Sequence, residues 1–188
     1  YGKSGKFYQK DSTGKVSRLG GGGGGGSGIE WQSNIINGAV KDIETAWTNT
    51  DVYLFQSSLN DSVVACYKVR KNHDAGSQKR MIIQVLVAEN SFTSKKFKFQ
   101  CGINLAKQGS GTLNNRTVTV EIGPITSAGA PVLYNLDFDI TDSSGQINSV
   151  NVESNDCLFL NITRIAASSD ELNDVIKLLP YNSEVYDV

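Results

Sequence analysis

A run of seven consecutive glycines, Gly20 to Gly26, limits what this chain can fold into more than any other feature. Glycine has no side chain to bury, and it loses more backbone entropy on folding than any other residue. No hydrophobic core can therefore continue through this run. The glycines separate a short polar arm from about 160 residues that are long enough for one domain with a sizeable core.

Charge divides at the same place. Residues 1–28 hold five basic residues and one acidic residue, whereas the remainder holds thirteen basic and eighteen acidic residues. The formal net charge of −1 argues against a general nucleic-acid binder. No apolar stretch of about 18 residues is present, so the sequence predicts no membrane insertion. This pattern is typical of a basic arm that docks on a partner and an acidic body that is held away from it.

Beyond residue 50 the chain predicts a series of strands. Short runs rich in β-branched and aromatic residues alternate with turn residues, and in 94–103 the phenylalanines alternate with lysines. The expected strands are 52–57, 62–70, 80–88, 94–103, 116–123, 132–140, 146–153, 157–165 and 174–179. Strands at this spacing predict an all-β fold, an antiparallel β-sandwich of two packed sheets. Residues 36–47 carry apolar residues at helical spacing and predict one short helix.

Residues able to carry chemistry are few, and the sequence predicts no enzyme and no cofactor. His73 is the single histidine and lies in a polar loop without a nucleophile motif, so we expect it to be solvated. Carboxylates on alternate strand positions could form an oxygen site for calcium, but their simpler interpretation is a solvent-facing strand. We therefore predict no metal, and the weak candidates are Asp137, Asp139 and Asp142.

The three cysteines, Cys66, Cys101 and Cys157, follow neither a disulfide framework nor a metal-binding spacing. Each lies in an apolar run, which predicts three buried thiols and assembly in a reducing compartment.

The glycine run itself has two interpretations. It can be a flexible linker. Alternatively its backbone N–H and C=O groups pair with neighbouring copies of the chain or with a docking surface. The second interpretation predicts a symmetric homo-oligomer, a trimer, with an oligomer seam at Gly20, Gly21, Gly22, Gly23, Gly24, Gly25 and Gly26.

The stretch 154–188 carries a turn acid (Asp156), an apolar strand with an arginine (LFLNITRI, with Arg164), an acidic loop (AASSDELND) and a last apolar strand (VIKLL). This order resembles the end of β-jelly-roll modules in tailed-bacteriophage fibre and head-fibre proteins. The segment DVYLFQSSLNDS at 51–62 is similar to the first strand and turn of such modules, and KFYQKDSTGKVSRLGGGG resembles their linker peptides. Pro180 departs from the pattern, which leaves the register of residues 180–188 open.

The resemblance implies a non-enzymatic, trimeric virion subunit that is assembled in the host cytoplasm, anchored to capsid or tail, and displays a jelly-roll head toward a host glycan or receptor. The divisions are an anchoring arm (1–19), a glycine spacer (20–28), a connecting segment (29–50) and the head (51–188). The expected particle anchors are Lys6, Phe7, Tyr8, Lys10, Lys15, Val16, Arg18 and Leu19.

The alternative is a carbohydrate-binding β-sandwich module of a larger protein. Such modules usually display a planar cluster of exposed aromatic residues, whereas both tryptophans here, Trp31 and Trp47, precede the predicted sandwich. A hydrolytic tailspike is a third possibility, but no parallel β-helix repeat is visible.

Overall fold

The predicted all-β sandwich is confirmed. The computed structural model describes residues 2–3, 6–10, 16–19, 29–33, 39–44, 50–56, 60–70, 76–87, 90–111 and 113–188. Every regular element in those ranges is a strand, and every strand pairing is antiparallel. Within them, no helix is long and apolar enough to cross a membrane.

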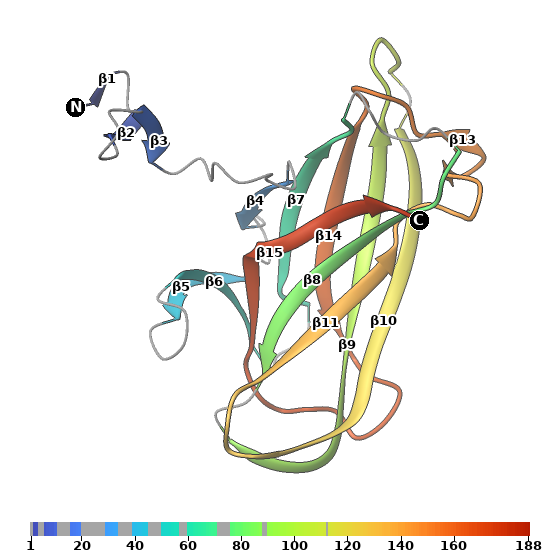
Figure 1. Ribbon diagram of the computed structural model, residues 1–188. Coiled ribbons are helices and arrows are strands. Elements are labelled where there is room, and N and C mark those ends of the chain that lie inside the picture. Colours follow the sequence, from blue (N-terminus) through green and yellow to red (C-terminus); the bar gives the residue numbers. More distant parts are fainter. Residues whose placement is uncertain are drawn as a thin grey trace.

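Ten strands form two five-stranded sheets (Figure 1). The first sheet has the order β10 (Leu113–Ala128), β9 (Ser91–Ala106), β14 (Cys157–Ile165), β7 (Ser62–Lys68) and β4 (Ile29–Ser33). The second sheet has the order β11 (Val132–Asp139), β8 (Lys79–Val87), β15 (Ile176–Asp187), β6 (Thr50–Phe55) and β5 (Val40–Glu44). From β6 onward the chain crosses between the sheets at nearly every step, as expected of a jelly-roll sandwich.

Five shorter strands lie outside these sheets. β1 (Gly2–Lys3), β2 (Lys6–Lys10) and β3 (Val16–Leu19) form a small sheet, so the predicted extended arm contains strand pairs of its own. β12 (Gln146–Ile147) pairs with β13 (Val150–Asn151) in a short hairpin.

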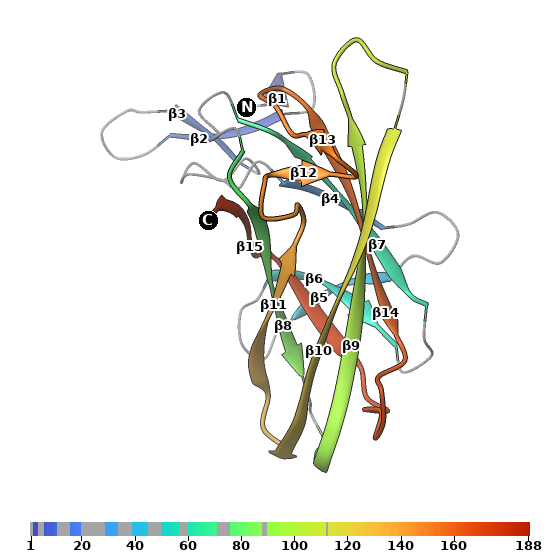
Figure 2. The same cartoon turned by 90° about the vertical axis from the view of Figure 1, so that its right-hand side faces the viewer.

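The core lies between the two sheets, which Figure 2 shows as two layers. Because successive side chains of a strand point to opposite faces, alternate residues of β9 and β8 are buried. Phe99 of the first sheet meets Phe55 of the second with ring centroids 5.0 Å apart, and Phe97 meets Tyr134 at 5.8 Å. Both pairs are edge-to-face, the arrangement that the ring quadrupoles favour.

Arg164 is the largest fully buried side chain, and it fastens the loop after β14 to the core. Its guanidinium donates hydrogen bonds to the carbonyl oxygens of Gln56 (2.9 Å), Asp174 (2.6 Å) and Leu172. It also forms an ion pair with Glu171 at 3.2 Å. Burial lowers the pKa of Arg164, and the Glu171 carboxylate opposes this effect.

The predicted helix at 36–47 is wrong where the structure describes it, because Val40–Glu44 form strand β5. Val40 pairs with Leu54 and Glu44 with Thr50, so β5 completes the edge of the second sheet. An apolar pattern this short fits either a helix or a strand. The segment becomes a strand because it can pair with the open edge of β6.

The last strand also differs from the expectation. β15 continues through Pro180 to Asp187 instead of ending at Leu179. Its pairing with β8 shifts between Leu179 and Glu184, so the proline lies in an irregularity, where a strand tolerates a residue without an N–H. This settles the register of 184–187, which pair with Ile82 to Lys79.

Candidate functional site

The outer face of the first sheet carries a regular array of small polar side chains. The register of β10, β9 and β14 aligns three rows across the strands. The rows are Thr119–Gln100–Thr163, Thr117–Gly102–Asn161 and Asn115–Asn104–Phe159. We call these nine positions the amide grid.

The sequence places the grid outside because the residues between its members fill the core. On β9, Phe99, Cys101, Ile103 and Leu105 are buried, so Gln100, Gly102 and Asn104 face outward. On β14, Leu158, Leu160 and Ile162 are buried in the same way. Phe159 is 42% exposed, a high value for a large apolar side chain on the middle strand of a sheet. None of the nine residues is charged.

Gly102 occupies the centre of the grid and places no side chain there. A Cβ atom at this position would meet only Cβ and the backbone oxygen of Asn161, at 3.8 and 3.9 Å. Beside it, the Asn161 Oδ1 atom is buried and has no hydrogen-bond partner among the described residues. Burial without a hydrogen bond costs free energy, and the Asn161 side chain has to turn outward before this oxygen can accept a hydrogen bond from a bound molecule.

One end of the grid is bordered by charge. Glu121 pairs in register with Lys98, and its carboxylate accepts hydrogen bonds from the Ser168 backbone N–H (2.7 Å) and hydroxyl (2.6 Å). These hydrogen bonds lower the pKa of Glu121.

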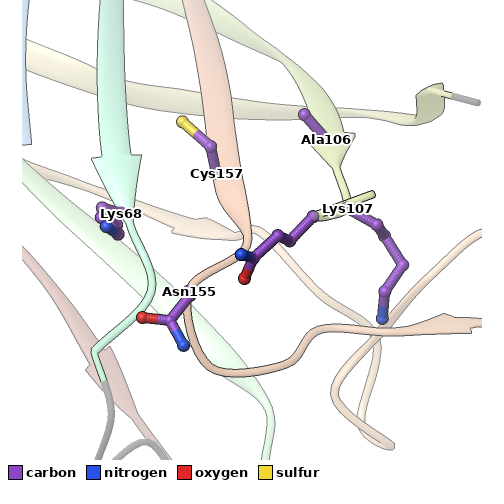
Figure 3. A pocket seen from close by; sticks show the side chains of 6 residues that line it. Lys68, Ala106, Lys107, Asn155 and Cys157 are labelled. Atoms are coloured by element: carbon purple, nitrogen blue, oxygen red, sulfur yellow. The ribbon is translucent and has the colours of Figure 1, made fainter. Parts of the chain in front are cut away.

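The other end of the grid opens into a hollow of about 530 Å³ (Figure 3). The residues around it are Lys68, Ala106, Lys107, Gln108, Asn155 and Cys157. Lys107 is held by Glu153 at 2.8 Å and by Asp156 at 3.4 Å. Burial opposes the charge of Lys107, but these two carboxylates outweigh it and raise its pKa.

The outer face of the second sheet has a different character. Arg80 forms ion pairs with Asp137 at 3.2 Å and with Asp139 at 2.8 Å, and the Tyr186 hydroxyl lies 3.4 Å from Asp137. The weak metal candidates thus face an arginine, while Asp142 Oδ1 accepts the backbone N–H groups of Ser144 and Gln146, each at 2.9 Å. In the part of the chain that the structure describes, no three His, Cys, Asp or Glu side chains gather as metal ligands.

The prediction of three buried thiols is correct for Cys101 only. Cys101 is fully buried, and burial raises the pKa of its thiol. Cys66 and Cys157 are half-buried on the outer face of the first sheet, because each lies at an outward position of its strand. The sequence showed the apolar runs but not the pairing that sets which side of the sheet each cysteine faces.

The predicted anchors have strand positions but no described side chains. Lys6, Phe7, Tyr8 and Lys10 lie in β2, and Val16, Arg18 and Leu19 lie in β3. Lys15, Gly20 to Gly26 and His73 lie outside the described residues. Particle anchoring, the glycine seam and the trimer therefore stay predictions.

No protein-family model and no curated protein matches the sequence. Two solved structures are similar in fold. One is a carbohydrate-binding module in complex with β-1,4-galactotriose, with 12% identity, a TM-score of 0.38, and coverage of 86% of this chain and 90% of that one. The other is described among carbohydrate-binding modules of the β-sandwich superfamily, with 8% identity, a TM-score of 0.43, and coverage of 96% and 72%. These values carry no argument about function.

Proposed function

We propose that this protein is a non-catalytic glycan-binding module, and that the amide grid is its binding surface. The observation that supports the proposal is the grid itself: uncharged polar side chains on three adjacent strands, an exposed phenylalanine, and a glycine at the centre. The two solved structures contribute nothing to it, because both TM-scores lie below 0.5.

Sugar rings present two kinds of surface, and the grid offers a partner for each. Their hydroxyl groups donate and accept hydrogen bonds, and the amides of Gln100, Asn104 and Asn161 can do both. Their C–H faces are apolar and can pack on the exposed ring of Phe159. A neutral surface of this kind favours an uncharged ligand with many hydroxyl groups.

The dimensions fit a short oligosaccharide. Neighbouring strands lie about 4.8 Å apart and alternate residues about 6.8 Å apart, so three strands by three positions cover roughly 10 by 14 Å. Because Gly102 has no side chain, a ring can approach the backbone of β9 between Thr117 and Asn161. A short oligosaccharide can therefore bind to this flat face without a deep groove.

A glycan array followed by calorimetry on the best ligand tests this proposal. Asn104→Ala and Asn161→Ala should each weaken binding about tenfold, since one lost hydrogen bond is worth about 1–1.5 kcal/mol. Asn135→Ala is the matched control, because Asn135 is an exposed asparagine on β11, a strand of the other sheet. Binding that is lost equally in all three variants, or no glycan bound at any concentration tested, would contradict the proposal.

The virion assignment remains a separate prediction, because it rests on the resemblance of residues 154–188, residues 51–62 and the arm to phage fibre modules. A glycan-binding head is compatible with that assignment and does not depend on it.

A further inference from the structure

Two cysteines meet on the outer face of the first sheet, next to the amide grid. Cys66 lies in β7 and Cys157 is the first residue of β14. The register pairs Cys66 with Phe159 and Cys157 with Lys68, so the cysteines face the same side and are offset by two residues. Their Sγ atoms are 2.9 Å apart. Unbonded heavy atoms normally stay about 3.5–4 Å apart, and a disulfide bond measures about 2.05 Å.

The surroundings of the pair favour reaction at Cys157. This residue borders the hollow of about 530 Å³, which gives a small molecule access to this end of β14 (Figure 3). Cys157 also lies at the very start of β14, in register with the last residue of β7, Lys68. Cys101 provides the contrast, since it faces the core and is fully buried.

We propose that Cys66 and Cys157 form a reversible disulfide bond that links β7 to β14. The oxidant is a small disulfide such as glutathione disulfide. The Cys157 thiolate attacks one sulfur of the oxidant, forms a mixed disulfide and displaces one thiolate. The Cys66 thiolate then attacks the Cys157 sulfur and displaces the second. Two protein thiols are oxidised, one oxidant disulfide is reduced to two thiols, and the two protons pass to these leaving groups.

The sulfur atoms must approach by less than about 1 Å to bond, and both strands are fixed close to them. Beyond the two strand ends, the Val69 N–H donates to the Asp156 carbonyl at 2.9 Å, and the Asn155 N–H donates to the Val69 carbonyl at 3.0 Å. The bond would fasten the corner of the sheet that carries Phe159. It is independent of glycan binding, since it rests on the two sulfur atoms alone.

The test uses the full chain equilibrated with reduced or oxidised glutathione, then denatured and titrated with a thiol reagent. We expect three titratable thiols after reduction and one after oxidation. Trypsin under non-reducing conditions then separates the three cysteines, because Cys66, Cys101 and Cys157 fall in peptides 42–68, 99–107 and 117–164. Mass spectrometry should find 42–68 linked to 117–164.

Matched variants identify the pair. Cys66→Ser and Cys157→Ser should each abolish the link, while Cys101→Ser should keep it. Oxidation should also raise the Tm of the wild type by roughly 5–10 °C, because the bond closes a long loop in the unfolded chain. Three titratable thiols after oxidation, a link to 99–107, or a link between two copies of the chain would overturn the proposal. The peptide map of the wild type shows which cysteines are linked even if a variant fails to fold.

Discussion

The two five-stranded sheets present opposite chemistry to their surroundings. On the second sheet the outward charged groups are paired: Arg80 forms ion pairs with Asp137 and Asp139, and Asp137 also contacts Tyr186. On the first sheet the amide grid is uncharged, and the Asn161 Oδ1 atom has no partner among the described residues. Paired charges complete a surface, whereas the exposed uncharged side chains of the grid, such as Asn115 and Thr117, are available to a ligand.

Because the two outer faces differ in this way, we expect substitutions on them to affect different properties of the protein. Both faces cover the same core, so a change in the core should affect them together. A change in the grid should affect binding alone, and a change in the ion-pair face should affect only the dependence of stability on pH or salt. Three substitutions test this division, ordered from the largest expected effect to the smallest.

Arg164→Met should give the largest effect, because it removes the support that both faces share. Methionine retains the apolar stem but leaves the carbonyl oxygens of Gln56, Asp174 and Leu172 without this donor and removes the ion pair with Glu171. We expect the free energy of unfolding to fall by about 3–5 kcal/mol. Chemical denaturation followed by tryptophan fluorescence measures it.

Arg164→Lys is the control for charge. Lysine keeps the positive charge but cannot present the planar fork of donors. Most of the decrease in the free energy of unfolding should therefore remain in Arg164→Lys. If Arg164→Met lowered the free energy of unfolding by less than about 1 kcal/mol, the buried guanidinium would not stabilise the fold as we infer.

Gly102→Val should change binding and leave the fold intact. A Cβ atom at this position meets Asn161 atoms at ordinary distances, and valine suits a strand better than glycine, so stability should change by less than about 1 kcal/mol. The branched side chain projects from the centre of the grid, so glycan affinity should fall at least tenfold.

Gly111→Val is the matched control, because a Cβ atom there has nothing within 4 Å and the position is an exposed one between β9 and β10. Calorimetry and thermal unfolding of both variants separate the two effects. Unchanged affinity in Gly102→Val would exclude the centre of the grid as a contact surface.

Much of this scaffold could be predicted from residue patterns. The strand at 157–165 has both ends as predicted, and the alternation in 94–103 correctly places Phe97 and Phe99 inside and Lys98 and Gln100 outside. A period of two is a local property of the chain, and burial of one face enforces it. Strand positions and facing therefore follow from short-range information.

The amide grid could not be predicted in the same way. Asn115, Asn104 and Phe159 form a row only through the register of three strands, and each of them alone looks like an ordinary solvent-facing residue. The contact between Cys66 and Cys157 likewise depends on a pairing across 91 residues. Arg164 illustrates a third case: its position in an apolar strand was visible, but its acceptors come from distant carbonyl groups.

Tyr186→Phe should give the smallest effect, and it concerns the ion-pair face. Burial and the neighbouring Asp137 carboxylate raise the pKa of Tyr186 above its usual value of 10.0. The unfolded chain therefore loses this proton first as pH rises, so the folded state loses stability from about pH 10 up through the folded pKa. Tyr186→Phe removes this part of the alkaline loss and changes stability at neutral pH by less than about 0.5 kcal/mol.

Thermal unfolding between pH 8 and 11 measures how steeply stability falls with pH. The control is Tyr181→Phe, because Tyr181 is an exposed tyrosine of the same strand. If both variants changed the pH dependence of stability equally, the contact between Tyr186 and Asp137 would not be the cause of the alkaline loss. Glycan affinity at neutral pH should be the same in both variants and the wild type. A change there would show that the two faces are coupled through the core, and that the division between a completed face and a binding face is too simple.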